Sequence, residues 1–153
     1  MDGFARILTH IVTVIFAGGS YLLLLAYLND HNPAFLATIG TLSMIYAFGY
    51  CCTVSSYRLD EEILVLQRPL FRIKIARTDI VRTRLVAPEE IHLFKLMGVY
   101  GLFGYTGIYY SRESGRVNMY GRKIDGAKLA IELTDGRIFI LTPDDPGSLF
   151  SAL

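Results

Sequence analysis

The chain has 153 residues, of which 52% are hydrophobic and 19% are charged, and its formal net charge is +1. A soluble domain of this length normally contains fewer hydrophobic and more charged residues, so we expect part of the chain to lie in lipid. The small net charge also gives no support for a nucleic-acid-binding protein, which would carry a marked basic excess.

The first third of the chain contains two long uncharged segments. No Asp, Glu, Lys or Arg occurs between Arg6 and Asp30, or between Asp30 and Arg58. A helix needs about 20 largely apolar residues to cross a bilayer, and we therefore predict transmembrane helices over residues 7–28 and 33–53. A cleaved signal peptide or a buried core helix is the alternative, but a signal peptide would have a more basic start, a shorter apolar run and a cleavage site.

The connection between these segments, residues 29–33, is rich in turn-forming and helix-starting residues. It therefore predicts a hairpin of two antiparallel helices. Arg6 and Arg58 flank the hairpin, whereas the turn contains Asp30 and no Lys or Arg. Because Lys and Arg are enriched on the cytoplasmic side, we expect residues 1–53 to anchor the protein in the cytoplasmic membrane with both termini in the cytoplasm.

From residue 54 onward the hydrophobic pattern changes to the two-residue period of β-strands. Strands are predicted at residues 57–59, 63–65, 71–75, 80–86, 108–111, 117–122, 129–133 and 137–141. Residues 91–97 fit either a helical turn or a continued strand. Asp145 followed by Pro146 predicts a short C-terminal helix, because Asp is a favoured N-cap residue and Pro is favoured at the first helical position.

Gly101, Gly104 and Gly107 lie in the segment GLFGYTG. A dinucleotide-binding loop has the spacing G-x-G-x-x-G between a strand and a helix, and a P-loop contains Gly-Lys followed by Ser or Thr. This segment has neither pattern and continues into the strand-like residues 108–110. We therefore expect a structural turn, in which only glycine permits a positive φ or a close approach of strands.

The remaining residues predict no catalytic site and no metal site. His92 is the single histidine after residue 53, so a catalytic triad or a histidine-rich metal site lacks members. Cys51 and Cys52 alone provide too few metal ligands. The carboxylates fall at turns and at a helix start, where solvation and capping explain them. We expect a protein that is not an enzyme and that binds no cofactor, nucleotide or nucleic acid.

The order of these strands and the final helix resembles the bacterial pleckstrin-homology (PH) domain families, which often carry two membrane spans before the domain. The resemblance covers residues 57–153 and rests on YRLD at 57–60, RIKI at 72–75 with TDI at 78–80, GLFGYTG at 101–107 and LTPDDP at 141–146. It implies an α+β fold. In that fold, a transmembrane helical hairpin (residues 1–53) precedes a PH-like antiparallel β-sandwich or barrel with a short C-terminal helix (residues 54–153).

Two functions follow from the resemblance. In the first, the protein is a membrane-anchored, non-catalytic binding or scaffolding module that associates with a protein partner or with another copy of itself. An accessory subunit of a larger membrane complex differs from this only in the partner. In the second, the domain binds anionic lipid head groups through the basic residues of its first strands, which are Arg58, Arg68, Arg72 and Lys74. A solvated, charged strand face is the alternative explanation for these residues.

Overall fold

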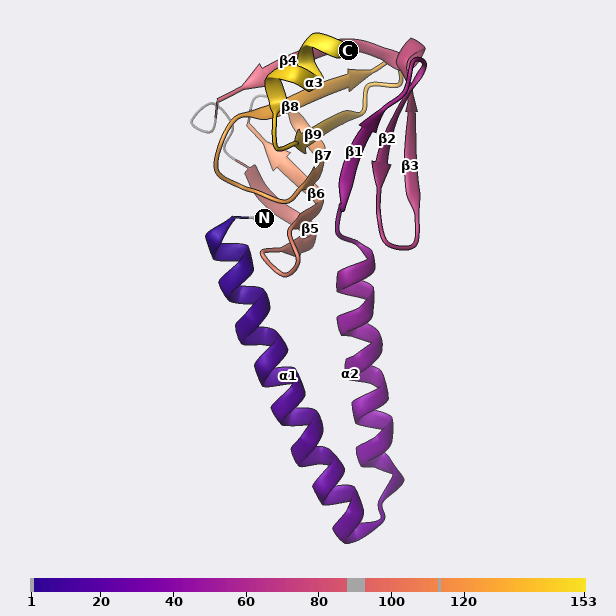
Figure 1. The fold of residues 1–153 in the computed structure, drawn as a ribbon, viewed down its shortest axis with the longest axis vertical. Helices are drawn as coiled ribbons and strands as arrows, with labels where there is room; N and C mark the ends of the chain where they lie inside the picture. The colour runs from indigo at the N-terminus through magenta and orange to yellow at the C-terminus, as the bar shows by residue number, and fades with distance from the viewer. Residues whose placement is uncertain (1, 88–92, 113) are drawn as a thin grey trace.

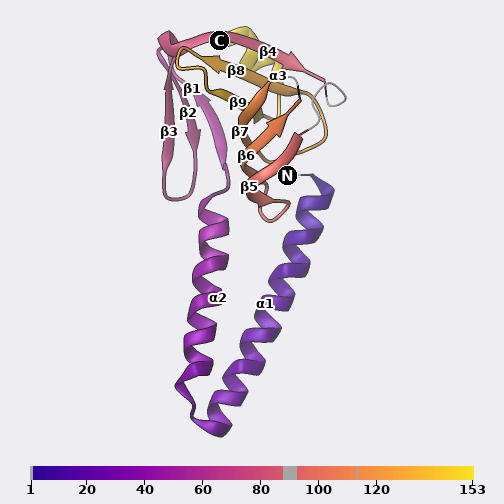
Figure 2. The ribbon, with the colours of Figure 1, turned by 180° about the vertical axis from the view of Figure 1, so that it is seen from behind.

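The structure is a computed structural model that describes residues 2–87, 93–112 and 114–153. Two long helices form an antiparallel hairpin, and a sheet-rich domain lies at its open end (Figures 1 and 2). The predicted fold class is confirmed, because two N-terminal helices precede two β-sheets and a short C-terminal helix. The first two residues of the segment 91–97, which include His92, lie outside the described residues.

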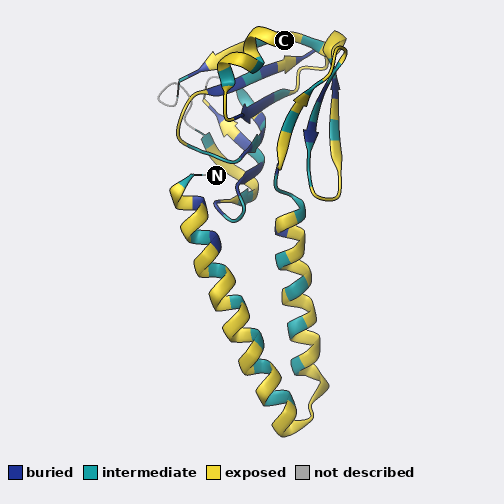
Figure 3. Ribbon diagram, viewed as in Figure 1, coloured by how far each residue is buried: buried dark blue, intermediate teal, exposed yellow. Residues whose placement is uncertain are grey.

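The hairpin consists of α1 (Gly3–Asp30) and α2 (Pro33–Cys51). Asp2 and Asn32 cap the two helices, each by accepting a hydrogen bond from a backbone N–H in the first turn. Both helices are long and apolar enough to cross a membrane, and their surfaces are largely exposed (Figure 3). A helix that is apolar around its whole circumference requires either a protein core or lipid around it.

The domain contains a three-stranded and a six-stranded sheet, and the order in the first is β1-β2-β3 and in the second β4-β8-β9-β7-β6-β5. The strands are β1 (Ser56–Leu59), β2 (Ile63–Gln67), β3 (Arg72–Ala76), β4 (Ile80–Val86), β5 (Leu93–Tyr100), β6 (Tyr105–Ser111), β7 (Gly115–Gly121), β8 (Lys128–Leu133) and β9 (Ile138–Thr142). The described part of segment 91–97 therefore belongs to a strand. A single 3₁₀ turn (Arg77–Asp79) joins the sheets, and neither sheet closes into a barrel.

Among the described residues, the strand pairs are antiparallel with one exception, the parallel pair of β7 and β9. After β7, the chain skips the neighbouring position in the sheet and forms β8 two positions away from β7. The tight turn at residues 134–136 then brings the chain back, so that β9 fills the position between β7 and β8 and runs parallel to β7. Because this pairing depends on where the chain crosses the sheet, the alternating hydrophobic pattern of each strand does not reveal it.

Two cores lie on opposite faces of the six-stranded sheet. The inter-sheet core lies between the two sheets and includes Leu64, Leu66, Ile75, Leu129, Ile131, Leu133, Phe139 and Leu141. The second core includes Val86, Tyr105, Tyr109, Val117, Met119 and Ile140. Successive side chains of β9 alternate between the two cores, as the pleat of a strand requires. The last helix, α3 (Pro146–Ala152), packs on the inter-sheet core through Leu149, and Asp145 caps it as predicted.

The start of α1 completes the second core. Ala5 is fully buried there, although it belongs to the helical hairpin. The Asp2 N–H donates to the Arg122 carbonyl at 3.2 Å, and the Asp2 carboxylate accepts a 2.9 Å hydrogen bond from the Ile124 N–H. Burial raises the pKa of the Asp2 carboxyl, but the hydrogen bonds from Ile124 and Ala5 outweigh it and the pKa is lowered. The N-terminal end of α1 is thus built into the domain.

We predict that Ala5→Leu destabilises the folded protein, because the larger side chain has no space in the second core. Overpacking of this kind lowers the free energy of unfolding by about 1–3 kcal/mol. Ala17→Leu, on the exposed surface of the same helix, is the matched control and should change that free energy little. Denaturant unfolding of the detergent-solubilised protein measures both variants, and an unchanged transition for Ala5→Leu would contradict the packing.

Candidate functional site

The loop between β5 and β6, residues 101–104, lies between the domain-facing ends of α1 and α2 (Figures 1 and 2). Its Phe103 ring makes edge-to-face contacts with Tyr46 and Tyr50 of α2, with ring centroids 5.1 and 5.4 Å apart. Such aromatic pairs contribute about 0.5–1.5 kcal/mol each beyond the area that they bury. The rings therefore fix the loop against α2.

Hydrogen bonds join the same loop to both helices. The Phe103 N–H donates to Thr9 Oγ1 of α1 at 2.9 Å, and the Phe103 carbonyl accepts from the hydroxyl of Thr53, just after α2. Phe103 has a φ of +59°, which is uncommon for a residue other than glycine. Its contacts on both sides hold it in this conformation, so that one residue bridges the hairpin and the domain.

The three predicted structural glycines lie in and beside this loop, and all have a positive φ. A Cβ atom on Gly107 would lie 2.2 Å from the carbonyl oxygen of Met97, and one on Gly104 would lie 2.8 Å from a backbone oxygen of β7. A Cβ on Gly101 would lie 2.7 Å from the Leu8 side chain of α1. Gly107 thus allows β5 and β6 to approach closely, whereas Gly101 allows the loop to approach α1.

Three of the four predicted lipid-binding residues share the outer face of the three-stranded sheet. Arg58 lies opposite Val65 on β2, Val65 lies opposite Lys74 on β3, and Arg72 is two residues from Lys74. All three basic side chains are exposed. Arg58 forms an ion pair with Asp60 at 3.4 Å, but exposed pairs of this kind contribute little to stability.

Arg68 lies apart from the other three basic residues, in the turn between β2 and β3. Its guanidinium lies over the ring of Tyr120, 4.9 Å from the ring centroid. Its Nε is buried and has no hydrogen-bond partner within the described ranges. Arg68 also lines a mostly apolar groove of about 590 Å³ between strands β5 to β7 and the end of α2, where Phe48 lies in the last turn and Cys52 directly follows the helix. We call this hollow the α2 groove.

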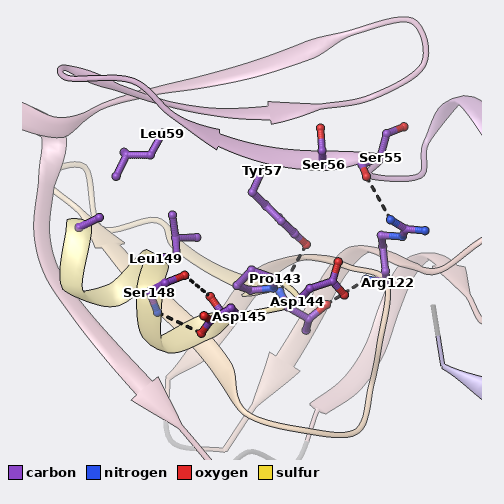
Figure 4. A pocket seen from close by; sticks show the side chains of 12 residues that line it. Ser55, Ser56, Tyr57, Leu59, Arg122, Pro143, Asp144, Asp145, Ser148 and Leu149 are labelled. Atoms are coloured by element: carbon purple, nitrogen blue, oxygen red, sulfur yellow. Dashed lines mark hydrogen bonds between the residues drawn. The ribbon is translucent and has the colours of Figure 1, made fainter.

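A second hollow, the α3 cleft of about 390 Å³, lies between β1 and α3 (Figure 4). Its polar side chains bind neighbouring protein groups. The Tyr57 hydroxyl donates to the Tyr120 carbonyl at 2.6 Å, Arg122 donates to the Ser55 carbonyl at 3.2 Å, and Asp145 caps α3. These bonds join the two sheets and the last helix, so the cleft has the character of a structural junction.

No cluster of three or more His, Cys, Asp or Glu side chains is placed to hold a metal ion among the residues that the structure describes. The adjacent Cys51 and Cys52 are both free thiols at the end of α2. The sequence did not single out Thr9, Thr53 or Phe103, which make the contacts between hairpin and domain. Hydroxyl residues at the ends of apolar helices were the available signal, but the partner of each lies far away in the sequence.

We predict that Gly107→Ala lowers the free energy of unfolding by about 3 kcal/mol or more, because a Cβ there collides with backbone as well as requiring a positive φ. Gly126→Ala is the matched control: Gly126 has a φ of +98° but open space around it, so only the strain of about 1–2 kcal/mol applies. Equal losses for the two variants in denaturant unfolding would show that β5 and β6 do not approach as described.

We also predict that alkaline pH destabilises the protein through Tyr57. Burial raises the pKa of Tyr57 to about 12, although a hydrogen bond from the Thr142 N–H opposes this. The unfolded chain, in which the pKa is about 10, therefore loses its proton first. The contribution of Tyr57 to the free energy of unfolding is therefore fully present below pH 10, and about 3 kcal/mol of it is lost as the pH rises through 12.

Unfolding free energies measured between pH 9 and 12, with short exposures, check this prediction. Tyr57→Phe should remove part of the fall, and the rest includes Tyr109, because burial raises its pKa to about 12 as well. Tyr110→Phe, at an exposed position, is the control and should leave the slope unchanged. A Tyr57→Phe profile with the wild-type slope would contradict the burial of this hydroxyl.

Comparison with known proteins agrees with the fold. The family model of the bacterial PH domain matches residues 55–153, which contain both sheets and α3. Searches of the curated proteins and of the solved structures found no significant match. PH domains are in general binding modules without catalytic activity. Because the match covers more than half of the chain, the protein belongs to the bacterial PH domain family.

Proposed function

We propose that this protein is a membrane-anchored, non-catalytic scaffolding module that associates with a second copy of itself through β5. The observation that carries this proposal is the exposed edge of the six-stranded sheet. In the described part of the chain, β5 pairs only with β6, so no strand lies along its other edge. Sheet edges of this kind accept an additional strand from another chain.

The side chains of β5 also favour pairing of this edge with another chain. Phe94, Leu96 and Met97 are exposed large apolar residues, and Leu96 is 60% exposed. Monomeric proteins usually protect an edge strand with charges, a proline, a β-bulge or a short length. The eight residues of β5 include a single charge, Lys95, and no proline, and the register with β6 shifts once, between Lys95 and Met97. Two copies with antiparallel β5 strands would pair these edges and bury the apolar side chains around a two-fold axis.

The membrane anchor is the second part of the proposal. It consists of residues 1–53, with spans at about 7–28 and 33–53, and the domain of residues 54–153 lies with both termini on the cytoplasmic side. The contacts of Asp2 and Ala5 support this arrangement, because they hold the start of α1 at the same end of the hairpin as the domain. A cleaved signal peptide would not supply a core residue. Arg6 at that end and Asp30 in the turn favour the cytoplasm for the domain.

Contact with anionic lipid head groups is a second candidate function. It is supported by the position of Arg58, Arg72 and Lys74 on one exposed sheet face. Each basic residue near an anionic leaflet contributes about 1 kcal/mol, which would orient a domain that the hairpin already anchors. Lipids retained after polymer extraction of native membranes test this function. Replacing the three residues with Ala should remove any enrichment of anionic lipid, and unchanged enrichment would exclude it.

For the main proposal, we predict that Leu96→Lys weakens self-association at least tenfold, because each copy would bring a charge to the paired edges; tenfold corresponds to about 1.4 kcal/mol. Val81→Lys is the matched control. Val81 is 62% exposed and lies on β4, the opposite edge of the same sheet. Light scattering and chemical crosslinking in mild detergent measure the assembly. A wild-type protein that is monomeric over the whole accessible concentration range would contradict the proposal.

A further inference from the structure

The turn between β2 and β3 presents two large apolar side chains to the surroundings. Leu70 and Phe71 are 68% and 64% exposed. The turn is nevertheless ordered, since the Arg68 N–H donates a 3.0 Å hydrogen bond to the Phe71 carbonyl. It thus holds two apolar side chains between two basic ones, Arg68 and Arg72. Neither Leu70 nor Phe71 belongs to one of the two cores formed by the described residues.

The pairing of β1 with β2 fixes where this turn lies relative to α2. The Ser55 N–H donates to the Gln67 carbonyl at 2.8 Å, and Ser56 lies opposite Gln67. The turn at 68–71 extends beyond Gln67 and therefore lies level with residues 52–55, directly after the end of α2. Both views show the closed end of β2 and β3 directed toward the hairpin, beside the domain-facing end of α2 (Figures 1 and 2).

The position of Arg68 is a second, independent observation that places the β2–β3 turn beside the end of α2. It lines the α2 groove together with Phe48, in the last turn of α2, and Cys52, directly after the helix. A helix that crosses a bilayer ends in the interfacial layer, where lipid phosphates and the upper acyl chains meet. A turn beside that helix end therefore faces the lipid surface. Apolar side chains insert into this layer, and long basic side chains beside them reach the phosphates.

We propose that Leu70 and Phe71 insert into the leaflet on the domain side of the bilayer, so that the β2–β3 turn is a third membrane contact beside the two helices. Arg72 is exposed at the edge of the turn and contacts lipid phosphates. Arg58 and Lys74 lie about 7 Å further along the strands, away from the helix end. The occupant of this surface is thus a lipid bilayer, contacted by the turn rather than by the whole basic sheet face.

This inference rests on the membrane anchoring proposed above but not on association through β5. It adds a distinct role for the turn. The hairpin and the domain that is docked on it could still tilt together as one body in the bilayer, whereas an additional contact on the α2 side restricts that tilt. The height of β5 above the membrane would then be the same in every copy, as pairing of two edges requires.

The absence of tryptophan from the chain allows a direct test with the full-length protein in phosphatidylcholine and phosphatidylglycerol vesicles. Phe71→Trp places a single fluorophore in the turn. Ile15→Trp, at an exposed position within α1, reports the proposed span. Val81→Trp lies on β4, at the end of the domain away from the hairpin (Figure 1), and serves as the control.

We expect lipids brominated on their acyl chains to reduce the fluorescence of Phe71→Trp and Ile15→Trp at least twofold, and aqueous acrylamide to quench mainly Val81→Trp. If Ile15→Trp is quenched by brominated lipid while Phe71→Trp behaves like Val81→Trp, the turn does not insert and the inference is overturned, with the anchor intact. If brominated lipid fails to quench Ile15→Trp as well, the anchoring itself is wrong and the inference falls with it.

Discussion

The packing of the β5–β6 loop between the ends of the two helices is the interaction on which the rest of the structure depends. Phe103 contacts aromatic rings of α2 and binds Thr9 of α1, and Ala5 extends α1 into the second core. Without these contacts, the hairpin would meet the domain mainly through Asp2 and the short connection at residues 52–55. With them, a helical hairpin and a β-rich domain share one core and are joined by hydrogen bonds from Asp2, Thr9 and Thr53.

This rigid connection has a consequence for binding. Association is weakened by the entropy lost when mobile parts become ordered, and a domain that is already fixed relative to its helical hairpin loses less. In the membrane arrangement that we propose, all copies would lie in one membrane plane, which would raise the effective concentration of matching surfaces. The proposed assembly could then use a single edge strand such as β5, although an edge of that size would be a weak contact between freely diffusing domains.

Much of this fold was predictable from the sequence because it depends on local patterns. Length and apolarity predict α1 and α2, and Asp145 with Pro146 predicts α3. Long-range features were not predictable: Thr9 and Phe103 are 94 residues apart, and the parallel pairing of β7 with β9 depends on chain path. Alternation also placed Phe71 in a strand with Ile73 and Ile75, whereas β3 begins at Arg72 and Phe71 lies exposed in the turn.

Hydrogen exchange of the Phe103 amide, followed by NMR of the full-length protein in bicelles, tests the central contact most directly. We predict that this loop N–H is protected as strongly as those of β6, because Thr9 Oγ1 accepts its hydrogen bond and opening requires separation of the hairpin from the domain. Thr9→Val, which resembles threonine in shape but lacks the hydroxyl, should remove most of that protection. A wild-type Phe103 amide that exchanges as fast as an unprotected loop would contradict the docking of the domain on its hairpin.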